Sequence, residues 1–137
     1  MKPRILLDTG PIVAFLHAGD EHHDWAKHQF NEFEAPLLTC EAVIAESCHL
    51  LRRIPGAPVQ VLKLIERGSI RLDLSLQQEH TALASLLKRY SDLQASLADV
   101  CLVRMSEIHD PSIVLTLDSD FHVYRRPGRK TIAVVHP

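Results

Sequence analysis

The sequence predicts a single α/β domain of three layers, α/β/α, with a central parallel sheet. Short apolar runs alternate with amphipathic segments along the chain, and no linker or internal repeat interrupts this alternation. Parallel strands need crossover connections, and helical crossovers cover both faces of the sheet. The length of 137 residues suits one core, so we expect residues 1–137 to form a single domain.

In the N-terminal half, apolar runs end at polar residues that can start a helix. Pro11 lies near the first turn of the first expected helix, a position where proline is tolerated. The expected elements are a strand at Arg4–Leu7, a helix capped by Thr9, a helix through the His22–His23 region, a strand at Pro36–Thr39 and a helix from Thr39 to about Arg53.

The C-terminal half continues the alternation. Gly68 stops one helix, and Ser75 with Gln78 has the spacing of a capping box for the next. The expected elements are a helix from about Val59 to Arg67, a strand at Ile70–Leu74, a helix from Ser75 through Tyr90, a helix at Ser96–Ile108, and strands at Ile113–Leu117 and Thr131–Val135. The Ser96–Ile108 helix is apolar around most of its circumference, so we expect it to be central.

Composition excludes several classes of protein. With 46% hydrophobic and 23% charged residues the chain should fold, and its net charge of -2 gives no sign of a strongly basic, nucleic-acid-binding surface. Its three cysteines have no CxxC spacing, which favours a reducing compartment. Asp8 interrupts the first apolar stretch, and no run approaches the roughly 18 residues that span a bilayer. We therefore expect a cytoplasmic protein with no membrane association.

Aspartates follow two of the expected strands directly. Asp8 comes after Arg4–Leu7, and Asp118 and Asp120 come after Ile113–Leu117. Ligands of open parallel sheets bind at the carboxyl ends of the strands, which makes these side chains candidates for a functional site. The alternative interpretation of each is an ordinary turn residue, because aspartate is common where a strand ends.

Two further acids lie on expected helices. Glu46 falls at the border of an apolar helix face, and its alternative role is a partly exposed ion pair with Arg53. Asp99 projects from an apolar helix, where an unpaired carboxylate would be costly. Its alternative role is to complete a capping box with Ser96.

These acids could meet at one end of the sheet and hold a metal ion. Neighbouring carboxylates repel and raise one another's pKa unless a divalent cation neutralises them. Oxygen ligands favour Mg²⁺ or Mn²⁺, which usually bind one or two protein carboxylates directly and keep several waters. Such a centre is suited to metal-assisted phosphodiester hydrolysis.

The acidic motifs resemble, in order and spacing, those of PIN-domain nucleases. The motifs are Leu7-Asp8-Thr9-Gly10-Pro11, Ala45-Glu46-Ser47, Leu97-Ala98-Asp99-Val100 and Thr116-Leu117-Asp118-Ser119-Asp120-Phe121. The resemblance covers nearly the whole chain, and the predicted fold is therefore PIN-like. The length, and Arg89-Tyr90-Ser91-Asp92-Leu93 ahead of Asp99, make the chain similar to VapC-type toxins of toxin–antitoxin pairs.

The resemblance implies a Mg²⁺- or Mn²⁺-dependent endoribonuclease. It further implies a homodimer with an RNA substrate and a separately encoded antitoxin as partner. Asp8 and Asp99 would be direct metal ligands, and Glu46 and Asp118 would complete the acidic set. Asp118 is preferred to Asp120 because it directly follows the strand and Thr116. Thr9 and Thr116 would orient waters or a phosphate, and Arg104 is expected to contact a phosphate.

Two other functions remain as alternatives. One is a catalytically inactive PIN fold that binds RNA or protein, and the other is a phospho-receiver domain. A receiver would need an acidic pair on the first strand, whereas Asp8 stands alone there. Without the four candidate acids, the 15 basic residues face 13 acidic ones, a net charge of +2. Binding of nucleic acid should therefore depend on the divalent ion more than on bulk charge.

Overall fold

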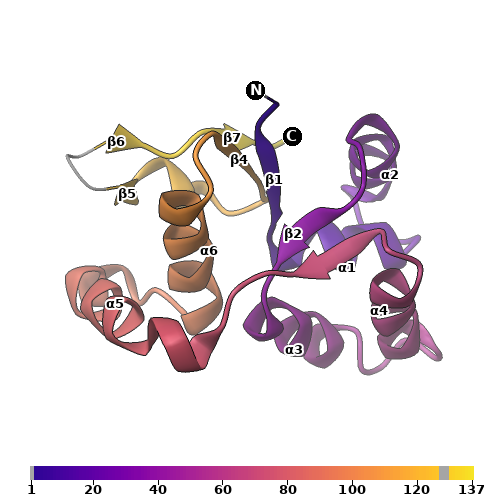
Figure 1. Cartoon of the computed structure of the whole chain (residues 1–137). Helices are drawn as coiled ribbons and strands as arrows, with labels where there is room; N and C mark the ends of the chain where they lie inside the picture. The colour runs from indigo at the N-terminus through magenta and orange to yellow at the C-terminus, as the bar shows by residue number, and fades with distance from the viewer. Residues whose placement is uncertain (1, 127–129) are drawn as a thin grey trace.

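The chain folds around a five-stranded parallel sheet of strand order β3-β2-β1-β4-β7 (Figure 1). This computed structural model describes residues 2–126 and 130–137. The strands are β1 (Arg4–Leu7), β2 (Leu37–Thr39), β3 (Ile70–Leu72), β4 (Ser112–Leu115) and β7 (Val134–Val135). Apolar runs buried on both sides build each central strand, as expected for a parallel sheet covered by helices. The predicted central parallel sheet is confirmed.

Helices cover both faces of the sheet and complete the three predicted layers. They are α1 (Thr9–Leu16), α2 (His23–Glu32), α3 (Glu41–Leu50), α4 (Ala57–Glu66), α5 (Leu76–Arg89) and α6 (Leu97–Ile108), with short 3₁₀ turns η1 (Ser91–Leu93) and η2 (Ser119–His122). Parallel crossovers are right-handed, so the connections from β1 to β3 lie on one face and the connection to β4 lies on the other. Figure 1 shows α5 and α6 on the opposite side of β1 from α3 and α4. Within the described residues, no helix combines the length and apolarity that crossing a bilayer requires.

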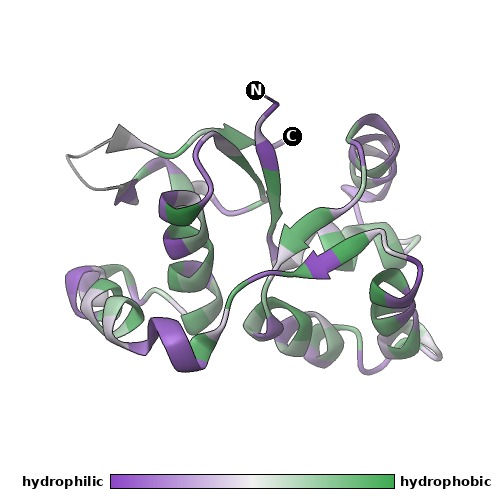
Figure 2. Ribbon diagram, in the orientation of Figure 1, coloured by the Kyte–Doolittle hydropathy of each residue, from purple (hydrophilic) through white to green (hydrophobic). Residues whose placement is uncertain are grey.

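The core lies between the sheet and its two helical layers. Hydrophobic colour runs along most of β1, β2 and β4, and hydrophilic colour lies mainly on the outer helices (Figure 2). The predicted central position of α6 is confirmed, because it contacts β1, β4, α3 and α5. Its buried residues are Ala98, Val100, Cys101, Leu102, Val103, Met105 and Ser106. The packing of these buried residues fixes the place of Asp99 in the first turn of α6.

Two expected helix caps are wrong. Thr9 is the first residue of α1, and Asp8 caps that helix by accepting a hydrogen bond from the Thr9 amide. Thr39 is the last residue of β2, and its hydroxyl donates to the carbonyl oxygen of Leu7 at 2.7 Å. This bond satisfies a buried backbone acceptor where β1 ends, so the hydroxyl is not free to cap α3, whose N-cap residue is Cys40.

Several predicted boundaries also need correction, and the strand expected at Ile70–Leu74 covers only Ile70–Leu72. The helix expected from Thr39 to about Arg53 covers only Glu41–Leu50, and the strand expected at Ile113–Leu117 covers Ser112–Leu115. The single strand expected at Thr131–Val135 is divided: Lys130–Thr131 (β6) pairs antiparallel with Arg125–Arg126 (β5), and only Val134–Val135 pairs with β4. An antiparallel hairpin therefore precedes the last strand of the main sheet.

Candidate functional site

The four predicted acids gather at the carboxyl end of the sheet. β1 and β4 are parallel neighbours with Leu7 opposite Leu115, so Asp8 and Asp118 leave the sheet at the same edge. Glu46 on α3 and Asp99 in the first turn of α6 reach this edge from two helices. Their negative charges act on one another, because Asp99 and Asp118 both raise the pKa of Asp8 and of Glu46. These charge effects place the four acids near one another, and their role as a functional site stays a prediction.

Asp8 is the buried centre of this cluster. It is 6% exposed, and both of its carboxylate oxygens accept hydrogen bonds: Oδ1 from the Thr9 amide at 2.8 Å and Oδ2 from the Thr116 hydroxyl at 2.6 Å. Burial, with a smaller contribution from the charges of Asp99 and Asp118, raises the pKa of Asp8 to about 6. The two hydrogen bonds lower this pKa only in part. A nearby positive charge would lower this pKa and offset the cost of ionising the buried carboxyl.

Thr116 connects two of the acids. Its fully buried hydroxyl accepts a hydrogen bond from the Asp118 amide at 2.8 Å and donates to Asp8 Oδ2. One oxygen atom thus links the end of β4 to the end of β1. The link fixes the Asp8 carboxylate and the backbone of Asp118 relative to each other, which is a positioning role for a residue that the sequence had marked as a water or phosphate contact.

Gly10 permits the close approach that completes this arrangement. A Cβ atom at Gly10 would lie 3.0 Å from Cβ of Leu117, the residue between Thr116 and Asp118. Contacts this short force a neighbour to move, and glycine avoids them because it has no side chain. The first turn of α1 can therefore pack directly on the segment that carries Asp118.

Replacement of Thr116 by valine is expected to destabilise the protein by about 1–3 kcal/mol, because the Asp118 amide and one Asp8 oxygen both lose a partner. The pKa of Asp8 should rise further, since the Thr116 hydrogen bond lowers it. Urea denaturation of Thr116→Val and of the matched Thr116→Ser, which keeps the hydroxyl, measures the difference. Equal stability of the two variants would contradict the linking role.

Asp99 has the capping role that was one of the two alternatives for it. It completes a capping box, in which Ser96 Oγ accepts from the Asp99 amide at 3.0 Å and Asp99 Oδ2 accepts from the Ser96 amide at 3.1 Å. Its carboxyl is half-buried, and burial with the charge of Asp118 raises its pKa. The other oxygen, Oδ1, accepts no hydrogen bond from any residue within 2–126 or 130–137. The capping role therefore leaves one carboxylate oxygen without a described hydrogen-bond donor.

Glu46 is exposed but belongs electrostatically to the cluster. Partial burial and the charges of Asp99 and Asp118 raise its pKa. The alternative ion pair with Arg53 is absent, and no described residue pairs with Glu46. Its carboxylate is therefore not committed to another structural contact.

Asp118 and Asp120 have different surroundings despite their close spacing. Asp118 caps η2, and its Oδ1 accepts a hydrogen bond from the Asp120 amide at 2.9 Å. The charge of Asp118 raises the pKa of Asp8, Glu46 and Asp99, whereas the charge of Asp120 acts on Tyr124. Asp118 is thus the strand-end acid that faces the other three.

The oxygen atoms at this edge fit a hard divalent cation. Thr9 Oγ1 is buried and has no hydrogen-bond partner among the described residues, so a polar atom remains to be satisfied beside Asp8. No three His, Cys, Asp or Glu side chains of residues 2–126 and 130–137 form a complete metal-binding cluster. Mg²⁺ usually takes one or two protein carboxylates directly and retains several waters, so the Asp8 carboxylate with the unpartnered Thr9 hydroxyl beside it has the donor chemistry that this ion prefers.

Comparison with known proteins agrees with this geometry. The family model described as "PIN domain" matches residues 5–127. The chain belongs to the PIN domain family. A structural match is the crystal structure of Mycobacterium tuberculosis VapC20, a sarcin–ricin loop cleaving toxin, with 22% identity, a TM-score of 0.73, and coverage of 87% of this chain and 93% of that chain. No protein of curated function matches in sequence.

Arg104 of the PIN domain is paired with two glutamates, one on α5 and one on α6. Its Nε donates to Glu79 at 2.7 Å and its Nη1 donates to Glu107 at 3.1 Å. These bonds join α5 to α6, and the side chain is less than one-third exposed. The arrangement gives Arg104 a structural role, and the phosphate contact expected for it has no support from these contacts.

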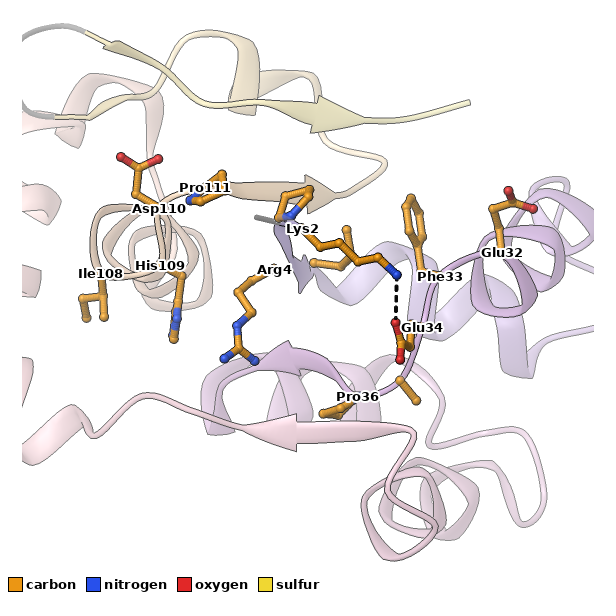
Figure 3. Close-up of a pocket in the computed structure, with 13 residues that line it drawn as sticks. Lys2, Arg4, Glu32, Phe33, Glu34, Pro36, Ile108, His109, Asp110 and Pro111 are labelled. Atoms are coloured by element: carbon orange, nitrogen blue, oxygen red, sulfur yellow. Dashed lines mark hydrogen bonds and ion pairs between the residues drawn. The ribbon is translucent and has the colours of Figure 1, made fainter.

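A separate pocket of about 750 Å³ lies at the opposite end of the PIN-domain sheet (Figure 3). It is lined by residues at or just before the starts of the strands, among them Lys2, Arg4, Pro36, His109 and Pro111. Lys2 reaches across it to Glu34 at 3.4 Å. None of the four acids contributes to its walls, so this pocket is not part of the candidate site.

Sequence reasoning missed one residue of the site. The Tyr124 hydroxyl donates to Asp99 Oδ2 at 3.3 Å, and the side chain is fully buried. Tyr124 lies 25 residues after Asp99 in an irregular segment, outside each short acidic motif. No local pattern links the two residues, and only the packing of the segment after η2 onto α6 brings them together.

Proposed function

We propose that this PIN domain is a Mg²⁺- or Mn²⁺-dependent endoribonuclease that hydrolyses RNA phosphodiester bonds, and that it is the toxin of a type II toxin–antitoxin pair. The observation that carries the proposal is the buried Asp8 carboxyl, whose pKa is raised to about 6 at the edge where Glu46, Asp99 and Asp118 converge. A perturbed carboxyl among like charges at the carboxyl ends of parallel strands is typical of a functional site.

Three of the four acids have carboxylate oxygens that no described donor contacts. Asp99 Oδ1 and Asp118 Oδ2 accept no hydrogen bond from the described residues, and Glu46 accepts none at either oxygen. We assign Asp8 and Asp99 as direct ligands, with Glu46 and Asp118 acting directly or through water. A divalent cation bound there lowers the pKa of water and stabilises negative charge on phosphate oxygens.

Hydrogen bonds from the protein would hold the carboxylates of the site in fixed orientations. Thr116 holds Asp8 in one orientation, and the capping box holds Asp99 in another. Thr9 Oγ1, which has no described partner, is placed to orient a water molecule or a phosphate oxygen. Such fixed donors and acceptors favour hydrolysis because they need no reorganisation when charge develops.

RNA as substrate and an antitoxin as partner are supported by likeness to VapC20, a toxin that cleaves the sarcin–ricin loop. We propose that this chain acts in the cytoplasm as a homodimer. Exposed apolar side chains on and beside α3 and α4 offer surface for a second copy or an antitoxin; they are Leu50, Val59 and Leu62, each more than half exposed. Light scattering with and without the antitoxin would measure these assemblies.

A matched pair of variants tests the proposed nuclease. With Mg²⁺ or Mn²⁺ present, wild type should cut total RNA at defined positions, and Asp118→Asn should reduce the rate by about 100-fold or more. Asp120→Asn should keep the rate within about threefold, because the charge of Asp120, unlike that of Asp118, does not raise the pKa of Asp8, Glu46 or Asp99. Mapping of the cut ends in each reaction measures both rate and position.

The alternative function is a PIN fold that binds RNA or protein without cutting it. Its distinguishing result is retention of RNA by the wild-type protein with no cleavage in Mg²⁺ or Mn²⁺, at protein concentrations well above that of the RNA. Equal activity of Asp118→Asn and Asp120→Asn would also contradict the assigned site.

A further inference from the structure

Tyr124 makes a direct hydrogen bond to a candidate metal ligand. Its hydroxyl donates to Asp99 Oδ2 at 3.3 Å, the same oxygen that accepts from the Ser96 amide at 3.1 Å. Two donors therefore converge on one carboxylate oxygen, and Oδ1 receives none from the described residues. This arrangement sets the rotation of the carboxylate and leaves Oδ1 available for a cation.

The ring of Tyr124 is held in place from two sides. It packs edge-on against Tyr90 at 4.7 Å between centroids and against Phe121 at 5.2 Å. The Tyr90 hydroxyl accepts from the Arg125 amide at 2.7 Å and donates to the Arg125 carbonyl oxygen, so it makes no hydrogen bond to Tyr124 or to an acid of the cluster. Tyr124 and Phe121 are completely buried. A ring held so closely presents its hydroxyl at a defined point.

The same segment carries Asp118. The Val123 and Tyr124 amides both donate to the carbonyl oxygen of Asp120, which closes the turn that Asp118 begins. Tyr124 thus joins the segment after β4 to the first turn of α6. A displacement of its hydroxyl would change the position of Asp99 relative to Asp118.

We propose that Tyr124 is a positioning residue of the candidate centre, which orients the Asp99 carboxylate for a divalent cation and couples it to the Asp118 segment. The proposal rests on the proposed metal-dependent function. Hydrogen-bond partners of metal ligands commonly change metal affinity by about 10- to 100-fold when removed. Because the Tyr124 bond is long for a hydroxyl donor, we expect the lower end of this range.

Titration calorimetry of the full-length protein with MnCl₂ tests the proposal. Tyr124→Phe removes one oxygen and keeps the buried ring, so the Mn²⁺ dissociation constant should rise about tenfold while the cooperative thermal transition is retained. Tyr90→Phe is the matched control, because its hydroxyl binds only the Arg125 backbone. It should lower thermal stability and change the Mn²⁺ dissociation constant by less than about threefold.

A spectroscopic readout separates positioning from general destabilisation. Mn²⁺ should perturb the near-ultraviolet tyrosine absorption of wild type and Tyr90→Phe, and this perturbation should disappear in Tyr124→Phe. Unchanged Mn²⁺ affinity in a folded Tyr124→Phe, or equal losses of affinity in both variants, would overturn the positioning role. Absence of Mn²⁺ binding by wild type would instead overturn the proposed metal centre, and the role of Tyr124 with it.

Discussion

Asp8→Asn is expected to lower RNA cleavage by about 100-fold or more and to stabilise the metal-free protein near neutral pH. The loss of activity follows from removal of a charged oxygen ligand at the centre of the site. The gain in stability follows from burial: the folded protein must ionise a carboxyl whose pKa is about 6, raised from its ordinary 3.8. At about pH 7 this ionisation costs roughly 3 kcal/mol, the upper limit of the gain.

The contribution of Asp8 to the stability of the folded protein should decrease as the pH rises. A carboxyl with a raised pKa favours the folded state fully below about pH 3.8, and this contribution is lost as the pH rises through about 6. Asp99 and Glu46 have raised pKa values and act in the same direction. The stabilities of wild type and Asp8→Asn should therefore converge near pH 4 and diverge toward pH 7. Thermal unfolding in chelator measures both curves; parallel curves would contradict the raised pKa of Asp8.

Removal of divalent cations is expected to reduce cleavage by wild type to background. The four acids would then repel one another without a neutralising charge, and the proposed hydrolysis would lose the cation that activates water. Cleavage should return when Mg²⁺ or Mn²⁺ is added in excess of the chelator. A cation at 100 times its dissociation constant should also stabilise the folded protein by about 2.7 kcal/mol.

A loss of activity in chelator must be distinguished from unfolding of the protein. Circular dichroism in EDTA should match that of the untreated protein, because the acids are held by Thr9, Thr116 and Ser96 without a metal. Cleavage that persists at full rate in chelator, after dialysis has removed bound metal, would contradict the proposed function.

Most of the architecture could be predicted because its signals are local. Apolar runs such as Arg4–Leu7 and an all-round apolar helix such as Ser96–Ile108 each determine their own structure, and the alternation of strands and helices fixes the parallel sheet. Asp8 and Asp118 could be placed together because parallel strands end at one edge. The meeting of these acids could therefore be predicted from the sequence.

The errors arose where tertiary contacts compete with local signals. Threonine commonly caps helices, but the Thr39 hydroxyl donates instead to the Leu7 carbonyl oxygen on the neighbouring strand. The run Thr131–Val135 has uniform strand propensity, yet only part of it meets β4. Arg104 is bound by Glu79, 25 residues earlier on α5. None of these partners can be identified from sequence spacing alone.

Direct measurement of Mn²⁺ binding tests the central claim, that Asp8, Glu46, Asp99 and Asp118 form one cation site. Wild-type protein should bind Mn²⁺ saturably near pH 7, with weaker binding near pH 5 because protons compete for Asp8. Asp8→Asn should lose this binding at the same concentrations. Equal Mn²⁺ affinity in wild type and folded Asp8→Asn would show that the acidic cluster does not hold the cation.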